Sequence, residues 1–203
     1  MSGCPDEIKR LIEHFDKQTD RLCSPDYSEA LLRVDFVQPF FTALGWDMDN
    51  TAGHAEQYRE VVHEDKVRVY GQTKAPDYSF RVGGVRKLFV EAKKPAVQIK
   101  QNWEPAYQLR RYGWSAKLPV SMLTNFAELA VYDCRIQPRQ LEKASVARRE
   151  YLRHGEYESR WDFLAATFSR EAVHRGDFDR YCEAKKGRGA QAFDDAFLAD
   201  IEK

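Results

Sequence analysis

Cysteine is scarce in this sequence, and the few cysteines present are scattered. The 203 residues include four cysteines, none in a Cys-x-x-Cys arrangement. A zinc site built from neighbouring cysteines is therefore excluded, and we interpret the four as reduced thiols of a cytoplasmic protein.

Long hydrophobic runs are also missing. No stretch of about eighteen apolar residues occurs, which is the length that a membrane-spanning helix needs. The first residues carry charges at Asp6, Glu7, Lys9 and Arg10 where a secretory signal would have an apolar segment. We therefore expect neither membrane insertion nor secretion, and we predict a cytoplasmic location.

An excess of either charge is lacking as well. Thirty-two basic residues balance thirty-two acidic ones, so the chain does not have the basic surplus typical of proteins that bind nucleic acid tightly by themselves. The sequence has no phosphate-binding loop of the Gly-x-x-x-x-Gly-Lys-Ser/Thr type, no complete dinucleotide-binding fingerprint and no internal repeat. ATP hydrolysis and dinucleotide chemistry therefore have no visible site.

What the sequence does have is enough apolar material for one core. Hydrophobic residues make up 43% of the chain, which is typical of globular proteins. We divide the chain into a core with N-terminal helices, residues 1–137, and an extension, residues 138–203. After Pro138 the apolar residues stand among many charges without a strand pattern, which predicts a helical extension.

Two hydrophobic runs near the middle of the chain predict a β-hairpin. Tyr78–Val82 and Val85–Lys93 are separated by two glycines, which suit a two-residue turn between antiparallel strands. Side chains alternate between the faces of a strand, so Glu91 and Lys93 point to the same face. Asp77 stands at the entry to the first strand, where the hairpin can place it beside Glu91.

This trio has the chemistry of a metal-dependent hydrolase. The carboxylates of Asp77 and Glu91, with the backbone carbonyl of Ala92, suit a hard cation such as Mg²⁺, for which Mn²⁺ can substitute. Lys93 can orient or deprotonate a water beside that cation, and the set fits attack on a phosphodiester. The alternative is structural: an Asp after Pro76 is common in turns, and Glu-x-Lys on a strand is a common ion pair.

The remaining pattern predicts helices around a sheet. Pro5–Leu22 has the spacing of an amphipathic helix, and Ser28 can cap a second helix that Pro39 kinks and Gly45 ends. Further apolar segments predict another helix and more strands: Gln101–Trp114 as the helix, and Tyr58–Val69 (with a turn at residues 63–66), Pro119–Thr124 and Glu128–Tyr132 as strands. The predicted fold class is α/β (α+β), a central mixed sheet flanked by helices with a C-terminal helical extension.

The trio resembles a known signature. Pro76-Asp77, followed by Glu91-Ala92-Lys93 after a hydrophobic strand, is similar to the PD-(D/E)XK nuclease motif with Glu as the middle acid. Longer stretches look like the N-terminal nuclease region of type IIG (MmeI-like) restriction-modification enzymes, to which the N-terminal domain of type I restriction R subunits is related. These stretches are residues 34–41, 44–47, 58–62 and 123–126. The resemblance implies a restriction-endonuclease-like core.

The same resemblance implies roles for three more residues. Glu29 stands where many of these nucleases carry an acidic residue that supports the metal site, although a carboxylate there also favours a helix N-terminus. Gln108 and Tyr112 resemble the Gln-x-x-x-Tyr element of some branches, and Gln108 would touch the scissile phosphate or Lys93. An ordinary contact between helix and core is the alternative for this pair.

The function that the resemblance implies is a Mg²⁺-dependent, type II (IIG-like) site-specific DNA endonuclease module of a restriction system, inactive or nonspecific in isolation. Its partners would be double-stranded DNA, a fused or separate adenine methyltransferase with a target-recognition domain, and transiently a second copy. S-adenosylmethionine would serve only the methyltransferase part, which is absent here. Residues 168–173 and 194–203 resemble a helical connector into it, so we expect a fragment of a longer enzyme or a short gene carrying the nuclease module. The alternative is a catalytically silent nuclease-fold scaffold that docks a methyltransferase or translocase partner.

Overall fold

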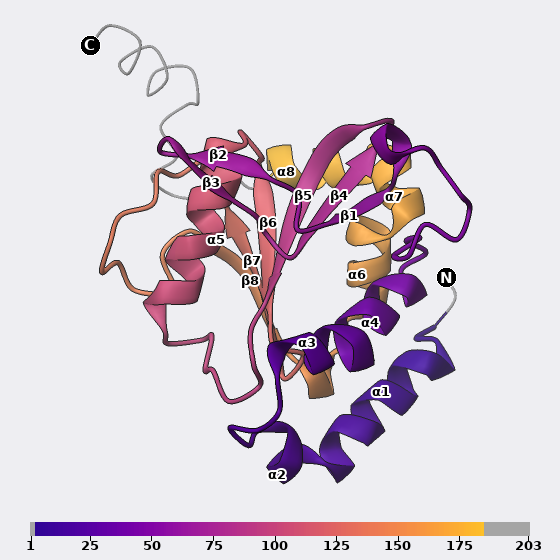
Figure 1. Cartoon of the computed structure of the whole chain (residues 1–203). Coiled ribbons are helices and arrows are strands. Elements are labelled where there is room, and N and C mark those ends of the chain that lie inside the picture. The colour runs from indigo at the N-terminus through magenta and orange to yellow at the C-terminus, as the bar shows by residue number, and fades with distance from the viewer. Residues whose placement is uncertain (1–2, 185–203) are drawn as a thin grey trace, which may run out of the picture.

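The computed structural model describes residues 3–184 and builds them around a sheet with helices on both sides (Figure 1). The helices are α1 (Asp6–Lys17), α2 (Thr19–Leu22), α3 (Glu29–Leu32), the π-helical segment η1 (Arg33–Val37), α4 (Gln38–Ala43), the 3₁₀ turns η2 (Glu56–Tyr58) and η3 (His154–Glu156), α5 (Trp103–Ser115), α6 (Trp161–Phe168), α7 (Arg170–His174) and α8 (Asp177–Ala184). The strands are β1 (Val61–His63), β2 (Val67–Val69), β3 (Gln72–Lys74), β4 (Tyr78–Val82), β5 (Val85–Ala92), β6 (Val120–Thr124), β7 (Glu128–Asp133) and β8 (Arg148–Arg153).

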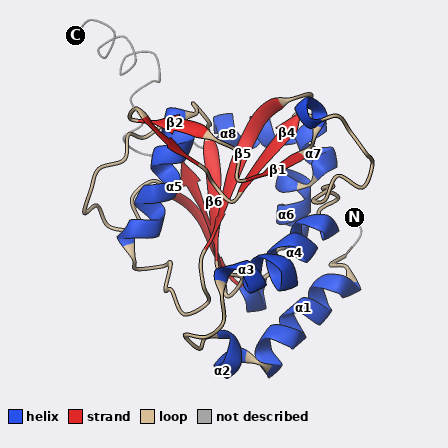
Figure 2. Cartoon of the chain, viewed as in Figure 1, coloured by secondary structure: helices blue, strands red, loops and turns tan. Residues whose placement is uncertain are grey.

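The main sheet has six strands in the order β1-β4-β5-β6-β7-β8. Strands β5 and β6 pair in parallel and the other neighbours pair antiparallel, so the sheet is mixed. Helix α5 makes the crossover that the parallel pair requires. The predicted fold class, a mixed sheet flanked by helices, is confirmed (Figure 2).

The two faces of the sheet have separate hydrophobic clusters. Along β5, Leu88, Val90 and Ala92 belong to the larger cluster with helices α1, α3, α4 and α6–α8. Phe89 points to the other face and packs with Leu109 of α5. Residues 89, 91 and 93 therefore share the α5 face, and the strand alternation alone turns Glu91 and Lys93 toward α5.

The central hairpin forms as predicted. Tyr78 pairs with Val90 and Val82 with Val85, so β4 and β5 run antiparallel through a two-residue turn. Gly83 and Gly84 both have positive φ, at 57° and 80°, which glycine adopts without a steric penalty. This register carries the residue before β4 alongside the carboxyl end of β5.

The second predicted helix contains a wide turn that the sequence did not indicate. Its start is as expected, because the Ser28 hydroxyl accepts a hydrogen bond from the Leu31 backbone N–H at 3.1 Å. Residues 33–37 then form a π-helical segment, closed by a hydrogen bond from the Gln38 N–H to the Arg33 carbonyl. Pro39 explains it, because a regular α-helix would set the proline ring against the Asp35 carbonyl, four residues earlier.

Strand β8 corrects the expectation of a wholly helical segment after Pro138. Residues 148–153 pair antiparallel with β7 and extend the main sheet beyond residue 137. Only Leu152 in this strand is buried, so the alternation that marks a half-buried strand is absent from the sequence. The helical expectation holds for α6–α8, while the division at residue 137 remains a prediction.

The predicted strand Tyr58–Val69 is also divided differently. Its first part, β1, joins the main sheet next to β4, whereas its second part, β2, forms a separate two-stranded sheet with β3. That small hairpin lies beside α5 (Figure 1). All three residues of strand β3 are exposed and polar, and no sequence pattern indicated this strand.

Part of the predicted connector, residues 194–203, lies outside the described residues. Within residues 3–184, no helix combines the length and the apolar character that crossing a membrane requires.

Candidate functional site

The Glu91 carboxylate is the centre of a polar cluster at the carboxyl end of β5. Glu91 is only 4% exposed, which is unusual because glutamate side chains are generally charged at neutral pH and remain in contact with water. Lys93 Nζ donates a hydrogen bond to Glu91 Oε1 at 2.7 Å, as the predicted strand alternation allows. Gln108 Nε2, from α5, donates to the same oxygen at 2.8 Å. One carboxylate oxygen therefore accepts bonds from two elements.

Asp77 joins this cluster through the backbone of β5. Its Oδ2 accepts a hydrogen bond from the Ala92 N–H at 2.7 Å. Its Oδ1 accepts one from the Arg33 guanidinium, on η1, at 3.1 Å. The hairpin thus brings Asp77 beside Glu91 as predicted, and the π-helical segment adds a cation.

Arg33 is a member of the cluster that the sequence reasoning missed. Its guanidinium also lies over the Tyr78 ring, 5.2 Å from the centroid. Arg33 follows Glu29 by four residues, which places both on one helix face. This spacing is the sequence feature from which Arg33 could have been identified as a neighbour of the site. The partner Asp77 stands 44 positions later, so nothing local identified the contact.

Gln108 and Tyr112 contact each other on α5, and Gln108 also bonds Glu91. Gln108 Nε2 donates to the Tyr112 hydroxyl at 2.9 Å, which fits their spacing of four on α5. The hydrogen bonds of Gln108 go to Glu91 and Tyr112, so it meets Lys93 only through the shared Glu91 oxygen, and the alternative contact with a scissile phosphate stays a prediction. The residue therefore restrains a carboxylate in this structure.

Glu29 lies near the cluster without a direct bond to it. It is the first residue of α3, immediately after the Ser28 cap. Burial raises the pKa of Glu29, the positive charge of Lys93 opposes that rise, and the negative charge of Asp77 reinforces it. Glu29 therefore interacts electrostatically with the trio, in addition to its position at a helix N-terminus.

The close approach of acidic groups shifts the proton affinities in the cluster. Burial raises the pKa of Glu91 to about 7, with Asp77 adding to the rise and Lys93 opposing it. For Lys93, burial disfavours the cation, but the negative charges of Glu91, Glu29 and Asp77 outweigh burial and raise its pKa. Lys93 is therefore a cation at neutral pH.

One acceptor of the cluster is left unsatisfied. Glu91 Oε2 is buried and has no hydrogen-bond partner, which leaves an acceptor to be satisfied. Two carboxylates, with the backbone carbonyl of Ala92, could hold Mg²⁺ together with waters. Residues 3–184 contain no group of three or more His, Cys, Asp or Glu side chains arranged for a metal, so Glu29 does not complete a three-carboxylate site.

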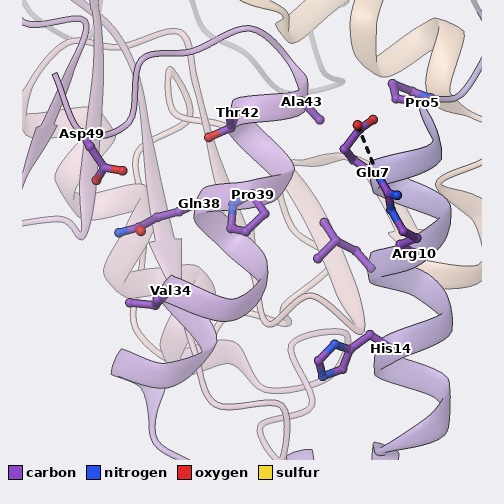
Figure 3. Close-up of a pocket in the computed structure, with 11 residues that line it drawn as sticks. Pro5, Glu7, Arg10, His14, Val34, Gln38, Pro39, Thr42, Ala43 and Asp49 are labelled. Atoms are coloured by element: carbon purple, nitrogen blue, oxygen red, sulfur yellow. Dashed lines mark hydrogen bonds and ion pairs between the residues drawn. The ribbon is translucent and has the colours of Figure 1, made fainter. Parts of the chain in front are cut away.

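A separate cavity of about 800 Å³ is lined by residues of the N-terminal helices (Figure 3). It lies between α1 and the helix η1–α4, with Leu11 and His14 on one wall and Val34 and Pro39 on the other. None of the predicted site residues lines it. The polar cluster and this cavity are thus distinct features of the surface.

Comparison with known proteins finds a match for the region that contains most of the cluster. Residues 59–140 match the family described as type I restriction enzyme R protein N terminus. Asp77, Glu91, Lys93, Gln108 and Tyr112 all fall within that range. No solved structure matches the chain.

A curated relative extends the likeness to nearly the whole chain. The sequence is 39% identical, over 199 residues, to the Escherichia coli protein "Type II restriction enzyme and methyltransferase RM.Eco57I". The alignment covers 97% of this chain and 20% of that relative. The chain therefore spans about a fifth of the length of the relative, and the resemblance to restriction-modification enzymes is confirmed.

Proposed function

We propose that this chain, whose residues 59–140 match the type I restriction enzyme R protein N-terminal family, is the Mg²⁺-dependent DNA endonuclease module of a restriction-modification system. One observation carries the proposal. Asp77, Glu91 and Lys93 converge at the end of β5, and the buried Glu91 carboxylate keeps an unpartnered oxygen.

The residues of the chain have separate tasks in this proposal. Asp77 and Glu91 would hold the cation, with the Ala92 carbonyl. A bound Mg²⁺ supplies a Lewis acid for the scissile phosphate and lowers the pKa of a water. Because its pKa is raised, Lys93 orients the attacking water and offsets negative charge as a cation, and we do not assign it the role of a base.

Two further residues keep the Glu91 carboxylate in place. Gln108 donates to Glu91 Oε1, and the Tyr112 hydroxyl accepts from the same amide group, which fixes the side chain of Gln108. The free oxygen of Glu91 then stays directed away from these donors. Glu29 adds negative charge near Lys93 and supports its protonated state.

Cleavage of plasmid DNA in Mg²⁺ or Mn²⁺ tests the proposal. Lys93→Ala should keep its fold and lose at least a hundredfold in cleavage rate, because the removed cation stabilises developing charge. Lys87→Ala is the matched control, since Lys87 lies on β5, the strand that Lys93 directly follows, and pairs with Asp179, away from the cluster. Equal cleavage by Lys93→Ala and the parent would contradict the mechanism.

A specific observation favours a second candidate, a silent scaffold with the nuclease fold. The Arg33 guanidinium and the Ala92 N–H already bond both oxygens of Asp77, so much of the cluster is satisfied without a metal. A nuclease should show a rise in melting temperature on adding Mn²⁺ that Asp77→Asn abolishes. A scaffold should show no such rise and should instead bind a methyltransferase or translocase partner.

The partners follow from the relative, which is named as a restriction enzyme and methyltransferase. We propose that double-stranded DNA is the substrate, and that a fused or separate adenine methyltransferase, with its target-recognition domain and S-adenosylmethionine, directs the module to its site. Transient pairing of two copies would allow both DNA strands to be cut. We expect weak or nonspecific cleavage by this chain alone.

A further inference from the structure

Arg111 is held between two tyrosine rings on the solvent side of α5. Its guanidinium carbon lies 5.3 Å from the centroid of Tyr107, one helical turn earlier, and 5.1 Å from the centroid of Tyr70 on the β2–β3 hairpin. Trp103 continues the row, with its ring 5.9 Å from that of Tyr107. The two rings restrain the guanidinium, while its edge keeps donors for a further partner.

Within the described part of the chain, Arg111 forms no ion pair with an acidic side chain. Arg111 Nε has no hydrogen-bond partner, and none of the ion pairs found within residues 3–184 involves Arg111. Most other arginines in that part of the chain pair with a carboxylate, among them Arg81, Arg86 and Arg110. A fixed and uncompensated guanidinium is suited to bind a phosphate through two hydrogen bonds.

Arg111 also stands at the rim of the polar cluster. It follows Gln108 by three residues on α5, so the two side chains are surface neighbours, and it directly precedes Tyr112. Gln108 contacts Glu91 at 2.8 Å. A nucleic-acid strand whose phosphate reaches the Glu91 carboxylate would therefore pass next to Arg111.

Tyr70 adopts an unfavourable backbone conformation, which suggests that its ring is required at this position. Tyr70 and Gly71 form the two-residue turn between β2 and β3, and Tyr70 has φ of 48° with 58% of its surface exposed. Asn or Asp normally takes this left-handed position, and a large aromatic residue there is strained. Strain of this kind concentrates where function requires a particular side chain. The ring that the turn presents is one of the two that hold Arg111.

We propose that Arg111, held between Tyr70 and Tyr107, is a phosphate-binding subsite that receives the backbone of duplex DNA beside the nuclease centre. The proposal rests on the proposed function for its ligand, and it assigns a DNA contact to the β2–β3 hairpin and to the outer face of α5. Arg111 supplies the charge-assisted hydrogen bonds, and Tyr70 keeps the guanidinium in place.

Fluorescence anisotropy with a labelled duplex, in EDTA so that no cleavage occurs, tests this subsite. Arg111→Gln should weaken binding about tenfold, the effect of one charge-assisted phosphate contact, and should lower the slope of log affinity against log salt by about one. Arg175→Gln, which removes the same charge on the α7–α8 side, should bind like the parent. Equal affinity and slope for Arg111→Gln and the parent would overturn the proposal, as would a parent that binds no duplex at low salt.

A second variant separates DNA binding from a purely structural role. Tyr70→Asn keeps a residue suited to positive φ and removes the ring, so we expect weaker DNA binding with a melting temperature at least as high as that of the parent. A lower melting temperature with unchanged DNA binding would mean that the ring only fastens the hairpin to α5. Arg111-dependent binding without a Mn²⁺-induced rise in melting temperature would reject the metal-dependent nuclease and keep the subsite, and cleavage that is insensitive to Arg111→Gln would do the opposite.

Discussion

At the scale of single residues, Glu91 combines burial with an unmet hydrogen-bonding need. Lys93 and Gln108 both bond Oε1, while Oε2 has no partner. A buried acceptor without a donor is costly, and proteins keep such groups where function requires them. The raised pKa of Glu91 reflects the same cost, because the protonated form avoids part of it.

This cost predicts that Glu91→Gln stabilises the metal-free protein at high pH. The folded-state pKa of about 7 exceeds the ordinary value of 4.5, so Glu91 favours folding below pH 4.5, and that contribution is lost as the pH rises through 7. The difference corresponds to roughly 3 kcal/mol at most. We expect urea denaturation in EDTA to show Glu91→Gln about 1–3 kcal/mol more stable than the parent at pH 8 and equal to it near pH 4.5.

Glu104→Gln, an exposed carboxylate on α5, is the control and should change stability little at either pH. If Glu91→Gln is less stable than the parent at pH 8, the carboxylate is not the source of the cost.

At the scale of elements, the placement of Gln108 depends on how closely α5 approaches the sheet. Gly113 makes this approach possible, because a Cβ there would lie 2.4 Å from Cys134 Sγ and 2.7 Å from Cys134 Cβ. Glycine is unfavourable inside a helix by about 1 kcal/mol relative to alanine, so its presence indicates a packing requirement. A small residue on α5 thus allows Gln108 to reach Glu91.

Gly113→Ala should therefore destabilise the protein despite the better helix propensity of alanine. We expect a net loss of about 1–3 kcal/mol, since the buried contact forces α5 away from β6 and β7. Denaturation by urea measures this loss, and cleavage should fall with it as Gln108 withdraws from Glu91. Cys134→Ala in the same chain removes Sγ and should restore part of the stability. A stabilising effect of Gly113→Ala would show that the contact between α5 and Cys134 can accept an additional methyl group.

The sequence pattern correctly predicted those helices and strands whose contacts are between residues close in the sequence. Two glycines and alternation specified the β4–β5 hairpin with the shared face of Glu91 and Lys93, and a capping serine specified the start of α3. Contacts between distant segments were not predictable: the Arg33 guanidinium meets Asp77 across 44 positions, and Tyr70 of the β2–β3 hairpin meets Arg111 of α5. Strand β8 was missed because its partners in the sheet, and not its own pattern, make it a strand.

At the scale of the whole molecule, α1 joins the start of the chain to the far end of the sheet. The Phe15 ring lies 5.3 Å from Phe126 and 4.9 Å from His154, and it is 1% exposed. Phe15→Ala should cost about 3–5 kcal/mol of the free energy of unfolding, as measured in urea, because the emptied site cannot collapse fully. Glu13→Ala, exposed on the same helix, should cost less than about 0.5 kcal/mol. A loss below about 1 kcal/mol for Phe15→Ala would mean that α1 is a dispensable addition.

The hydrogen bond between α1 and the turn η3 has a consequence for the order of folding during synthesis. Asp16 Oδ1 and His154 Nε2 are 2.8 Å apart, yet 138 positions separate them in the chain. Helix α1 leaves the ribosome before the strands of the sheet, but its docking surface is complete only after β8 and the turn η3 have emerged. Chains arrested before residue 154 should expose the apolar side of α1 to chaperones, whereas the β4–β5 hairpin can form early because its contacts are local.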